Sequence, residues 1–548
     1  MKHHATLWEA IADRIPDAVA LRHDAREVAW GAFDDRAARL AQALLDAGIG
    51  RGDTVAIDLY NCPEYFEVFF AALKIRAVPA NVNYRYGSDE LLSLLENAQA
   101  KVLVYDAALR DRVAPIVAGA TDIRLYIEVG GDDGPGPIPA VAYEDVVAGH
   151  EPAARIARDD QDVWLSYTGG TTGLPKGVLV RMERSVTYAL WYRDMLLGEE
   201  TSLEPVDFAA ARAAAGTPFS GIPASPLMHS TGFVVASLPA LAAGGVVTTL
   251  VHRSFDAHEL LGTIEAVRGN VVAIVGDAFA IPIIKALDVG KPGGGAYDTS
   301  SLKVIASAGV AWSAQNKERL LAHIPQVALH DSCGATEGVA YGISRVSAGD
   351  ELSTATFGVG PGVIVLSPDG EELPPGEVGF LAGPTTARGY FGDPVKTAEV
   401  FFLRNGEQYC KPGDLGRVEL DGTVTLIGRG STTINTGGEK VHPAEVEQAI
   451  STLESVEDCV VVGVPDERFG QTVAALVARV PGGTIEAEDV AAVVRGVLAG
   501  YKVPRRVRFV DHVPRLPNGK IDYPTSIELA KDAAVVSGSG RGAGGGER

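Results

Sequence analysis

The sequence predicts an α/β protein in which a large region of wound sheets is followed by a small α+β domain. Short β-branched runs alternate with longer Ala/Leu-rich amphipathic segments up to about residue 425, and such alternation is typical of helices wound onto a sheet. The pattern changes after the glycine-rich stretch 428–430, as expected at a domain junction. A chain of 548 residues, 46% of them hydrophobic, also predicts more than one core.

In the large region, three helix–strand pairs show the alternation most clearly. They are RAARLAQALLDAG (36–48) before DTVAIDLY (53–60), ELLSLLENAQA (90–100) before KVLVYD (101–106), and HELLGTIEAV (258–267) before VVAIVG (271–276). DVWLSYT (162–168) and GVLV (177–180) are predicted strands on either side of a glycine-rich loop.

The small domain has its own order of elements. A predicted helix at 443–452 is followed by strands at 458–464 and 474–480, a helix at 486–500 and a strand at 505–510. The end of the chain, GSGRGAGGGER, is low in complexity. We therefore expect a large domain at 1–428, a small domain at 429–528 and a disordered tail at 529–548.

Composition excludes several classes of function. The net charge of −22 disfavours nonspecific binding to nucleic acid or to an anionic membrane. The four cysteines form no CxxC pair and no disulfide framework, which suits a reducing cytoplasm. The N-terminus does not resemble a secretory signal, and no apolar run is long enough to span a membrane.

The loop YTGGTTGLPKG (167–177) predicts an oligophosphate site. Its glycines leave backbone amides open, its threonines add donors, and Lys176 adds positive charge. It is not a Walker A motif, because Lys176 is followed by glycine rather than by Ser or Thr and the loop links two predicted strands. Taken alone, a glycine-rich hairpin without any ligand remains the alternative.

Five further motifs follow the loop in a fixed order. They are GATEG (334–338), YCKPGD (409–414), LIGRG (426–430), NTGGEKVHPAEVE (435–447) and PNGK (517–520). Together with the loop they resemble the adenylate-forming superfamily, which includes acyl-CoA synthetases, luciferases and peptide-synthetase adenylation domains. The resemblance covers roughly residues 5–525. It implies a β-barrel-like subdomain within the large domain and a mobile C-terminal domain.

The resemblance assigns the residues that hold ATP. The loop would hold the β- and γ-phosphates, through Thr168, Gly169, Gly170, Thr171, Thr172 and Lys176. Thr336 would contact the α-phosphate, and Glu337 would bind Mg²⁺, a cation that suits one or two carboxylates together with phosphates. The ribose would be held by Asp414 and Arg429, and the adenine by Gly309 and Asp331.

The resemblance also assigns the groups near the acyl carbon. Lys520 would reach the substrate carboxylate and the α-phosphate, and His229 in SPLMHSTGF would lie beside the acyl pocket. In a second pose of the small domain, Gly437 and Gly438 would line a tunnel for the pantetheine arm of coenzyme A. Its phosphates would meet basic residues of the small domain, Lys502, Arg505 and Arg506, although an exposed basic edge is an equal alternative.

Each assigned residue also has an ordinary structural interpretation. Glu337 alone is a solvated loop charge, the sequence PGD that ends at Asp414 is a turn signature, and Arg429 alone would form a surface ion pair. Lys520 alone is a turn lysine, and His229 alone is a structural histidine. The ordered set of motifs, rather than any one residue, favours the functional assignments.

The sequence departs from the family pattern in four places. Cys333 stands where a tyrosine usually stacks on adenine, a contact worth about 1–3 kcal/mol if nucleic-acid stacking is a guide. The hinge is Ser431 or Thr432 instead of Asp or Lys, and Leu516 or Pro517 stands where a polar residue commonly precedes x-G-K. An extra segment lies at about 200–224. The Asp-Ser pair before GATEG, the stretch GRGSTTINTGGEKV and the extra segment together resemble actinobacterial acyl-CoA ligases for steroid side chains and other bulky polycyclic acids. This resemblance favours a bulky hydrophobic acid over acetate.

The resemblance thus predicts an AMP-forming acyl-CoA ligase that uses ATP, Mg²⁺ and coenzyme A and acts in the cytoplasm. A homodimer is suggested by the family alone. Two enzymatic alternatives are transfer of the acyl group to a carrier protein and thioesterification of preformed acyl-AMP only, the second motivated by Cys333. A nucleotide-binding protein without catalysis is the alternative from a different class.

Overall fold

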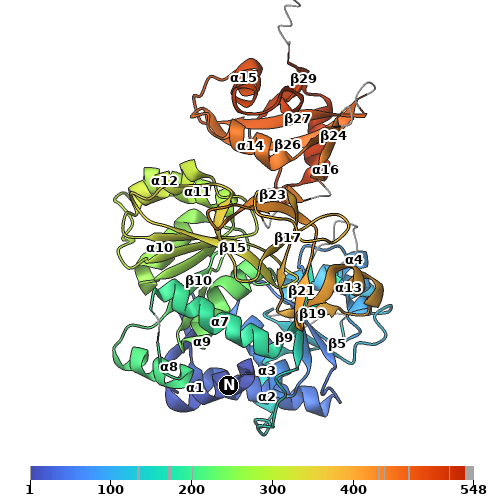
Figure 1. Cartoon of the computed structure of the whole chain (residues 1–548). Helices are drawn as coiled ribbons and strands as arrows, with labels where there is room; N and C mark the ends of the chain where they lie inside the picture. The colour runs from blue at the N-terminus through green and yellow to red at the C-terminus, as the bar shows by residue number, and fades with distance from the viewer. Residues whose placement is uncertain are drawn as a thin grey trace, which may run out of the picture.

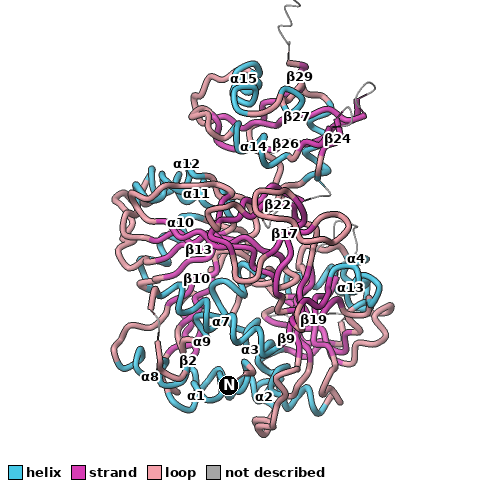
Figure 2. The backbone as a smooth tube through the Cα atoms, in the orientation of Figure 1, coloured by secondary structure: helices cyan, strands magenta, loops and turns pink. Residues whose placement is uncertain are grey.

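The computed structural model shows a large domain built on two sheets and a small domain built on a third (Figures 1 and 2). The structure describes residues 2–131, 136, 138–168, 176–199, 201–429, 432–436, 439–466, 470–516 and 519–536. The small domain lies on the side of the large domain where α11, α12 and β23 are found (Figure 1).

The first sheet has eight strands, and most pairs of neighbouring strands within it are parallel. Its order is β19 (Ala387–Tyr390), β9 (Lys176–Arg181), β8 (Val163–Thr168), β4 (Val78–Asn81), β3 (Thr54–Asp58), β5 (Ala100–Asp106), β6 (Leu125–Val129) and β7 (Ala140–Ala142). The predicted strands at 53–60, 101–106, 162–168 and 177–180 are confirmed, and β8 pairs antiparallel with β9 across the glycine-rich loop. The loop therefore connects two strands, as predicted.

The second sheet begins as a wound α/β sheet and continues as antiparallel strands. Its order is β2 (Arg26–Ala29), β1 (Val19–His23), β11 (Val246–Thr249), β10 (Ser220–Pro223), β12 (Val271–Ile274), β13 (Val304–Ala308), β14 (Ala328–Ala335), β15 (Val339–Val346), β16 (Thr356–Val359), β23 (Thr423–Arg429), β22 (Asp414–Val418), β18 (Gly379–Pro384), β21 (Glu407–Cys410) and β20 (Phe401–Arg404), with β17 (Ile364–Leu366) paired to β18. The antiparallel strands belong to the region where a barrel-like subdomain was expected. Among the described residues, these strands continue the second sheet.

Helices cover the two sheets and separate them. They are α1 (His4–Arg14), α2 (Trp30–Asp46), α3 (Pro63–Lys74), α4 (Ser88–Asn97), α5 (Arg110–Val113), α6 (Tyr143–Gly149), α7 (Met182–Leu197), α8 (Pro205–Ala214), the π-helix η3 (Thr231–Ser237), α9 (Leu238–Ala242), α10 (Ala257–Val267), α11 (Gly276–Val289), α12 (Ala314–His323) and α13 (Pro394–Val400). The extra segment of the sequence contains α8, which packs against α1 and buries Phe208 and Ala209.

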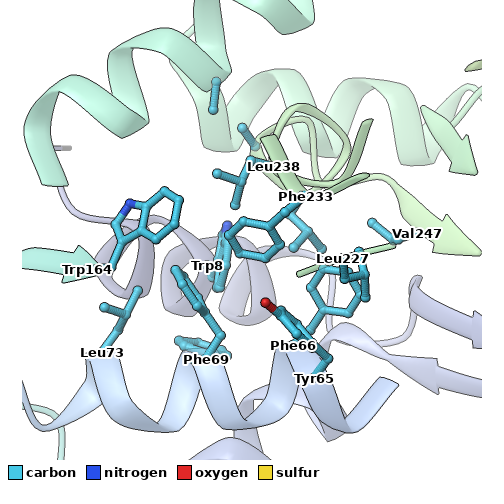
Figure 3. Packing of buried hydrophobic residues seen from close by; sticks show 14 of the residues in the cluster. Trp8, Tyr65, Phe66, Phe69, Leu73, Trp164, Leu227, Phe233, Leu238 and Val247 are labelled. Atoms are coloured by element: carbon cyan, nitrogen blue, oxygen red, sulfur yellow. The ribbon is translucent and has the colours of Figure 1, made fainter. Parts of the chain in front are cut away.

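Helix α3 is buried along its whole length, as expected for a helix that is apolar on nearly every side. Its Phe69 contacts Phe233 of η3 with ring centroids 4.8 Å apart, and Trp164 of β8 contacts the same Phe233 at 5.7 Å (Figure 3). This aromatic cluster fixes η3 relative to β8. It therefore also fixes His229, just before η3, relative to the glycine-rich loop that follows β8.

The small domain contains a six-stranded sheet. Its strands are β25 (Glu439–Val441), β24 (Ile434–Thr436), β27 (Gly470–Arg479), β28 (Arg506–Val510) and β29 (Ala534–Val535), with β26 (Val456–Asp466) paired to β27. Helices α14 (Pro443–Ile450), α15 (Ala487–Val497) and α16 (Tyr523–Lys531) pack on it. The predicted order of helices and strands is confirmed.

The start of the predicted disordered tail at 529 is wrong. Helix α16 runs to Lys531, and β29 pairs with β28. The reason is burial of α16 against the sheet of the small domain. Ser526 and Ala530 of this helix are buried, and Ile527 packs against the apolar cluster that contains Ala530. Ordered structure therefore reaches residue 536, and residues 537–548 lie outside the described part. No described helix is long and apolar enough to span a membrane.

Candidate active site

Strand β19 brings the phosphate loop and the Glu337 motif together. Glu337 follows β14, and its Oε1 accepts a hydrogen bond of 2.6 Å from the hydroxyl of Tyr390 in β19. Lys176, the first residue of β9, has its ammonium nitrogen 6.0 Å from the centroid of the Tyr390 ring. Since β19 pairs with β9, one tyrosine contacts the predicted metal ligand and lies beside the predicted phosphate lysine.

The turn after Glu337 accepts only glycine. Gly338 has a φ of +84°, and a Cβ built on it would lie 2.2 Å from Oγ1 of Thr386. The hydroxyl of Thr385 donates to the backbone carbonyl of Glu337. Two neighbouring threonines therefore hold the backbone on which Thr336 and Glu337 are presented, with both side chains half-buried.

Only the ends of the phosphate loop are described. Thr168 and Lys176 are partners in the β8–β9 ladder, so the intervening residues must connect adjacent strands. The predicted ligands within the loop lie outside the described residues, as do the two glycines of the predicted pantetheine tunnel; they are Gly169, Gly170, Thr171, Thr172, Gly437 and Gly438. Their roles remain predictions, as does that of the Thr168 side chain.

The two predicted ribose ligands are adjacent in the structure. Asp414 begins β22 and is the register partner of Arg429, the last residue of β23. Asp414 is buried, and its Oδ2 accepts a 3.0 Å hydrogen bond from the hydroxyl of Tyr341 in β15. Tyr341 thereby fixes the carboxylate, a contact that the sequence analysis missed because no motif contains this tyrosine.

Cys333 is unsuited to be a nucleophile. The thiol is buried in β14, and burial raises its pKa well above the usual range, with the charges of Asp414 and Asp331 acting in the same direction. A nucleophilic cysteine needs a thiolate and a lowered pKa. Cys333 is therefore a small, buried and protonated side chain at the position where the resemblance places a tyrosine.

Asp331 forms a buried ion pair that the sequence did not predict. Its Oδ2 lies 2.8 Å from the ammonium of Lys317 in α12, which also donates to the carbonyl of Ser353 at 2.7 Å. Burial raises the pKa of Asp331 to about 6, and the charge of Lys317 opposes this rise. One carboxylate oxygen is thus already engaged, and the adenine contact stays a prediction for the other.

Replacing Lys317 with methionine is expected to destabilise the protein by about 3–5 kcal/mol, since it leaves the Asp331 carboxylate buried without its partner. Urea unfolding at neutral pH measures the change. The exposed Lys303 gives a matched Lys303→Met control. Adding Asp331→Leu should recover part of the loss, whereas an unchanged unfolding midpoint in Lys317→Met would contradict the importance of the pair.

The charge of Lys520 acts on His229 across the domain junction. Burial lowers the pKa of His229 to about 3, and the positive charges of Lys520 and Arg85 act in the same direction. The imidazole is therefore neutral, and its buried Nε2 has no hydrogen-bond partner among the described residues. The charge of the predicted catalytic lysine thus acts on the residue predicted to border the acyl pocket.

The turn that carries Lys520 rests on the large domain. A Cβ built on Gly519 would lie 3.0 Å from the Cβ of Ala278 at the start of α11. Within the small domain, Arg515 donates to the carbonyl of Gly519 at 2.9 Å and forms a two-pronged ion pair with Asp458. The turn is therefore held from both sides.

Other predicted residues also take defined places. Gly309 follows β13 with a φ of +94°, and Thr231 of η3 donates to the carbonyl of Ala308 next to it, so this backbone is close to His229. In the small domain, Lys502 pairs with Glu445 at 2.6 Å, and Arg506 donates to the carbonyl of Lys531. These two basic side chains therefore have contacts within their own domain.

A family model described as "AMP-binding enzyme" matches residues 8–391, and one described as "AMP-binding enzyme C-terminal domain" matches residues 445–520. A 3-oxocholest-4-en-26-oate–CoA ligase of Rhodococcus rhodochrous is 37% identical over 98% of each chain. A medium/long-chain-fatty-acid–CoA/3-oxocholest-4-en-26-oate–CoA ligase of Mycobacterium marinum is 37% identical over 95% of each. A feruloyl-CoA synthase of Amycolatopsis is 32% identical over 92% of this chain and 94% of that one.

Solved structures agree in fold. ATP-bound MatB from Rhodopseudomonas palustris has a TM-score of 0.77 and 26% identity over 96% of this chain and 99% of that one. A benzoate CoA ligase from Burkholderia xenovorans has a TM-score of 0.81 at 22% identity, over 96% of this chain and 100% of that one, a likeness of fold. The chain belongs to the AMP-binding enzyme family. Within that family it is a carboxylate–CoA ligase.

Proposed function

We propose that the enzyme activates a bulky hydrophobic acid, of long-chain, steroid or terpenoid type, and joins it to coenzyme A. A carboxylate oxygen attacks the α-phosphorus of ATP and pyrophosphate leaves, which forms an acyl-AMP. The CoA sulfur then attacks the acyl carbon, the thiol proton passes to water, and AMP leaves with the bonding electrons. Relatives that act by name on 3-oxocholest-4-en-26-oate and on medium- and long-chain fatty acids support this substrate class.

The observation that carries this proposal is that Gly519, next to Lys520, packs on α11 of the large domain, where the charge of Lys520 acts on His229. A cation beside the carboxylate and the α-phosphate stabilises charge that develops in the adenylation transition state. Thr336 would donate to the same phosphate. The neutral His229 would border the acyl carbon without adding a competing charge.

The other predicted ligands surround this point. Lys176 and the loop residues would hold the departing pyrophosphate, whose charge is stabilised by backbone and side-chain donors. Asp414 and Arg429, partners across β22 and β23, would hold the ribose. Gly309 and Asp331 would border the adenine, and Gly437 and Gly438 the pantetheine arm.

The donor set fits Mg²⁺ bound together with the nucleotide. Among the described residues no group of three or more His, Cys, Asp or Glu is placed to hold a metal ion, whereas Mg²⁺ is usually held by one or two carboxylates together with substrate phosphates. Glu337, fixed by Tyr390, supplies such a carboxylate. The ion would offset phosphate charge during adenylation.

ATP–pyrophosphate exchange in the presence of Mg²⁺, run with short, long, aromatic and polycyclic acids, tests the proposal. We expect the fastest exchange with long and polycyclic acids, and CoA thioester formation from the same acids. A parallel assay supplies acyl-AMP with CoA. If supplied acyl-AMP is converted to the CoA thioester but no acid supports ATP–pyrophosphate exchange, the half-reaction enzyme is favoured. If neither reaction occurs, the proposal is overturned. Activity with a pantetheinylated carrier protein but not with CoA would favour the carrier alternative.

A hollow of the large domain near Lys520 supports CoA as the acceptor. It is lined by Tyr60, Tyr84, Arg85, Arg253 and Phe279, among others. The Arg253 guanidinium lies 4.7 Å from the centroid of the Tyr60 ring, and Arg85 lies 5.2 Å from that of Tyr84. Guanidinium groups bind phosphates and aromatic faces stack on bases, so this hollow would receive the nucleotide part of CoA.

Replacing Arg253 with alanine is therefore expected to raise the KM for CoA about tenfold, since one charge-assisted hydrogen bond is lost. ATP–pyrophosphate exchange, which needs no CoA, should not change. The exposed Lys396, paired with Glu399 in α13, provides a Lys396→Ala control. An unchanged KM for CoA in Arg253→Ala would exclude this hollow as the nucleotide site.

We also propose a cytoplasmic location. All four cysteines, Cys62, Cys333, Cys410 and Cys459, are free thiols, and a reducing compartment keeps thiols in that state.

A further inference from the structure

The two faces of β14 have different surroundings. The carboxylate of Asp331 points to Lys317 of α12, whereas the hydroxyl of Ser332 lies 3.1 Å from the hydroxyl of Tyr192 in α7. Side chains alternate along a strand, so His330 lies on the same face as Ser332 and toward α7. This face leads along β14 to Thr336, where the acid is activated.

His330 has no hydrogen-bond partner for either ring nitrogen among the described residues, although it is completely buried. Burial lowers its pKa to about 4, and the charge of Arg345 acts in the same direction, so the ring is neutral. A neutral imidazole has one N–H donor and one acceptor nitrogen. Buried polar groups are almost always paired with protein, ordered water or a ligand, so the two ring nitrogens are open to a partner from outside the chain.

Aromatic side chains of α7 lie on the side of β14 that His330 shares with Ser332. Tyr188 and Tyr192 of α7 stack with ring centroids 5.5 Å apart, and Tyr192 is buried against Ser332. The register partner of His330 in β15 is Arg345, whose side chain is exposed. His330 is thus a buried polar group on the face of β14 that contacts Tyr192 through Ser332.

The spacing of His330 and Thr336 along the chain limits the distance between His330 and the carboxyl group of a bound acid. His330 precedes Thr336 by six residues, which corresponds to at most about 20 Å at the usual rise of a strand. An extended acid of steroid size, with its carboxyl at Thr336 and Lys520, would place its opposite end near His330. A simple fatty acid has no polar atom at that end.

We propose that His330 donates a hydrogen bond to a keto or hydroxyl oxygen at the end of the acid far from the carboxyl. The preferred substrate is therefore a bulky acid that is polar at both ends. This inference rests on the proposed function and adds a determinant of specificity to it. An acid that lacks this oxygen would leave the ring nitrogen of His330 without a hydrogen bond. The enzyme would therefore discriminate against such an acid.

The test compares kcat/KM for two steroid acids that differ only in a ring ketone far from the carboxyl, with palmitic acid as a third substrate. We expect the intact enzyme to favour the keto acid at least tenfold over its oxygen-free analogue. In His330→Phe that ratio should fall to near one, and in His330→Gln, which keeps a donor, part of it should remain. His323→Phe, at an exposed histidine of α12 paired with Asp288, should keep the full ratio.

The outcomes separate this inference from the proposed function. Activation of palmitic acid with equal rates for the two steroid acids, or a ratio unchanged in His330→Phe, would overturn the role of His330 alone. Failure of all three acids would overturn the proposed function. Thermal unfolding of each variant checks folding, and if His330→Phe does not fold, the wild-type ratio and His330→Gln still decide the matter.

Discussion

Replacing Lys520 with alanine is expected to lower ATP–pyrophosphate exchange by about 10²–10³, the effect of removing one preorganised charged donor from a transition state. The structure places this lysine close enough to His229 to lower the pKa of that histidine. Thioester formation from supplied acyl-AMP should largely persist, because the lysine is needed only while the carboxylate and the α-phosphate carry charge together.

Both half-reactions are measured on the same preparation. Lys531→Ala is the matched control, since Lys531 is an exposed lysine of α16 that pairs with Glu528 in the same domain. Equal loss of both half-reactions in Lys520→Ala would contradict a role confined to adenylation. Retained exchange would remove Lys520 from the site.

Replacing Glu337 with glutamine is the second change with a large expected effect. Glutamine keeps the size and accepts the hydrogen bond from Tyr390, but it removes the negative charge that a hard cation requires. Loss of several kcal/mol of metal-assisted stabilisation corresponds to a fall in exchange of about 10² or more. Exchange rates measured over a range of Mg²⁺ concentrations report the change.

Tyr390→Phe separates charge from position in the same cluster. It leaves the Glu337 carboxylate in place but removes the hydrogen bond of 2.6 Å that orients it. We expect a smaller fall, about tenfold, because one hydrogen bond to a charged group is lost. A fall in Tyr390→Phe as large as that in Glu337→Gln would mean that Tyr390 contacts the nucleotide itself.

The residues that sequence analysis missed form hydrogen bonds or ion pairs with the predicted site residues. Tyr390 holds Glu337, Tyr341 holds Asp414, and Lys317 pairs with Asp331. Each partner lies 14 to 73 residues away along the chain from the residue it contacts. No local pattern marks such pairs, because they form only when separate strands and helices meet.

The secondary structure was more predictable than these contacts. The strands that became β3, β5, β8, β9 and β12 were predicted from β-branched runs, since period and composition act within a few residues. The end of the chain was less predictable. Its low complexity suggested a tail from 529, but burial of Ala530 against the small sheet extends α16 to Lys531.

The sequence by itself determined the class of chemistry. The phosphate loop, the acidic residue after a strand and the lysine near the C-terminus each lie in a short motif, so the motifs and their order can be identified without the structure. Only the tertiary structure decided that Tyr390 lies near both Lys176 and Glu337, that the charge of Lys520 acts on His229, and that His330 is buried without a hydrogen-bond partner among the described residues. The physical reason is that hydrogen bonding, burial and charge depend on distance in space. The chain sets those distances only when its sheets pack together.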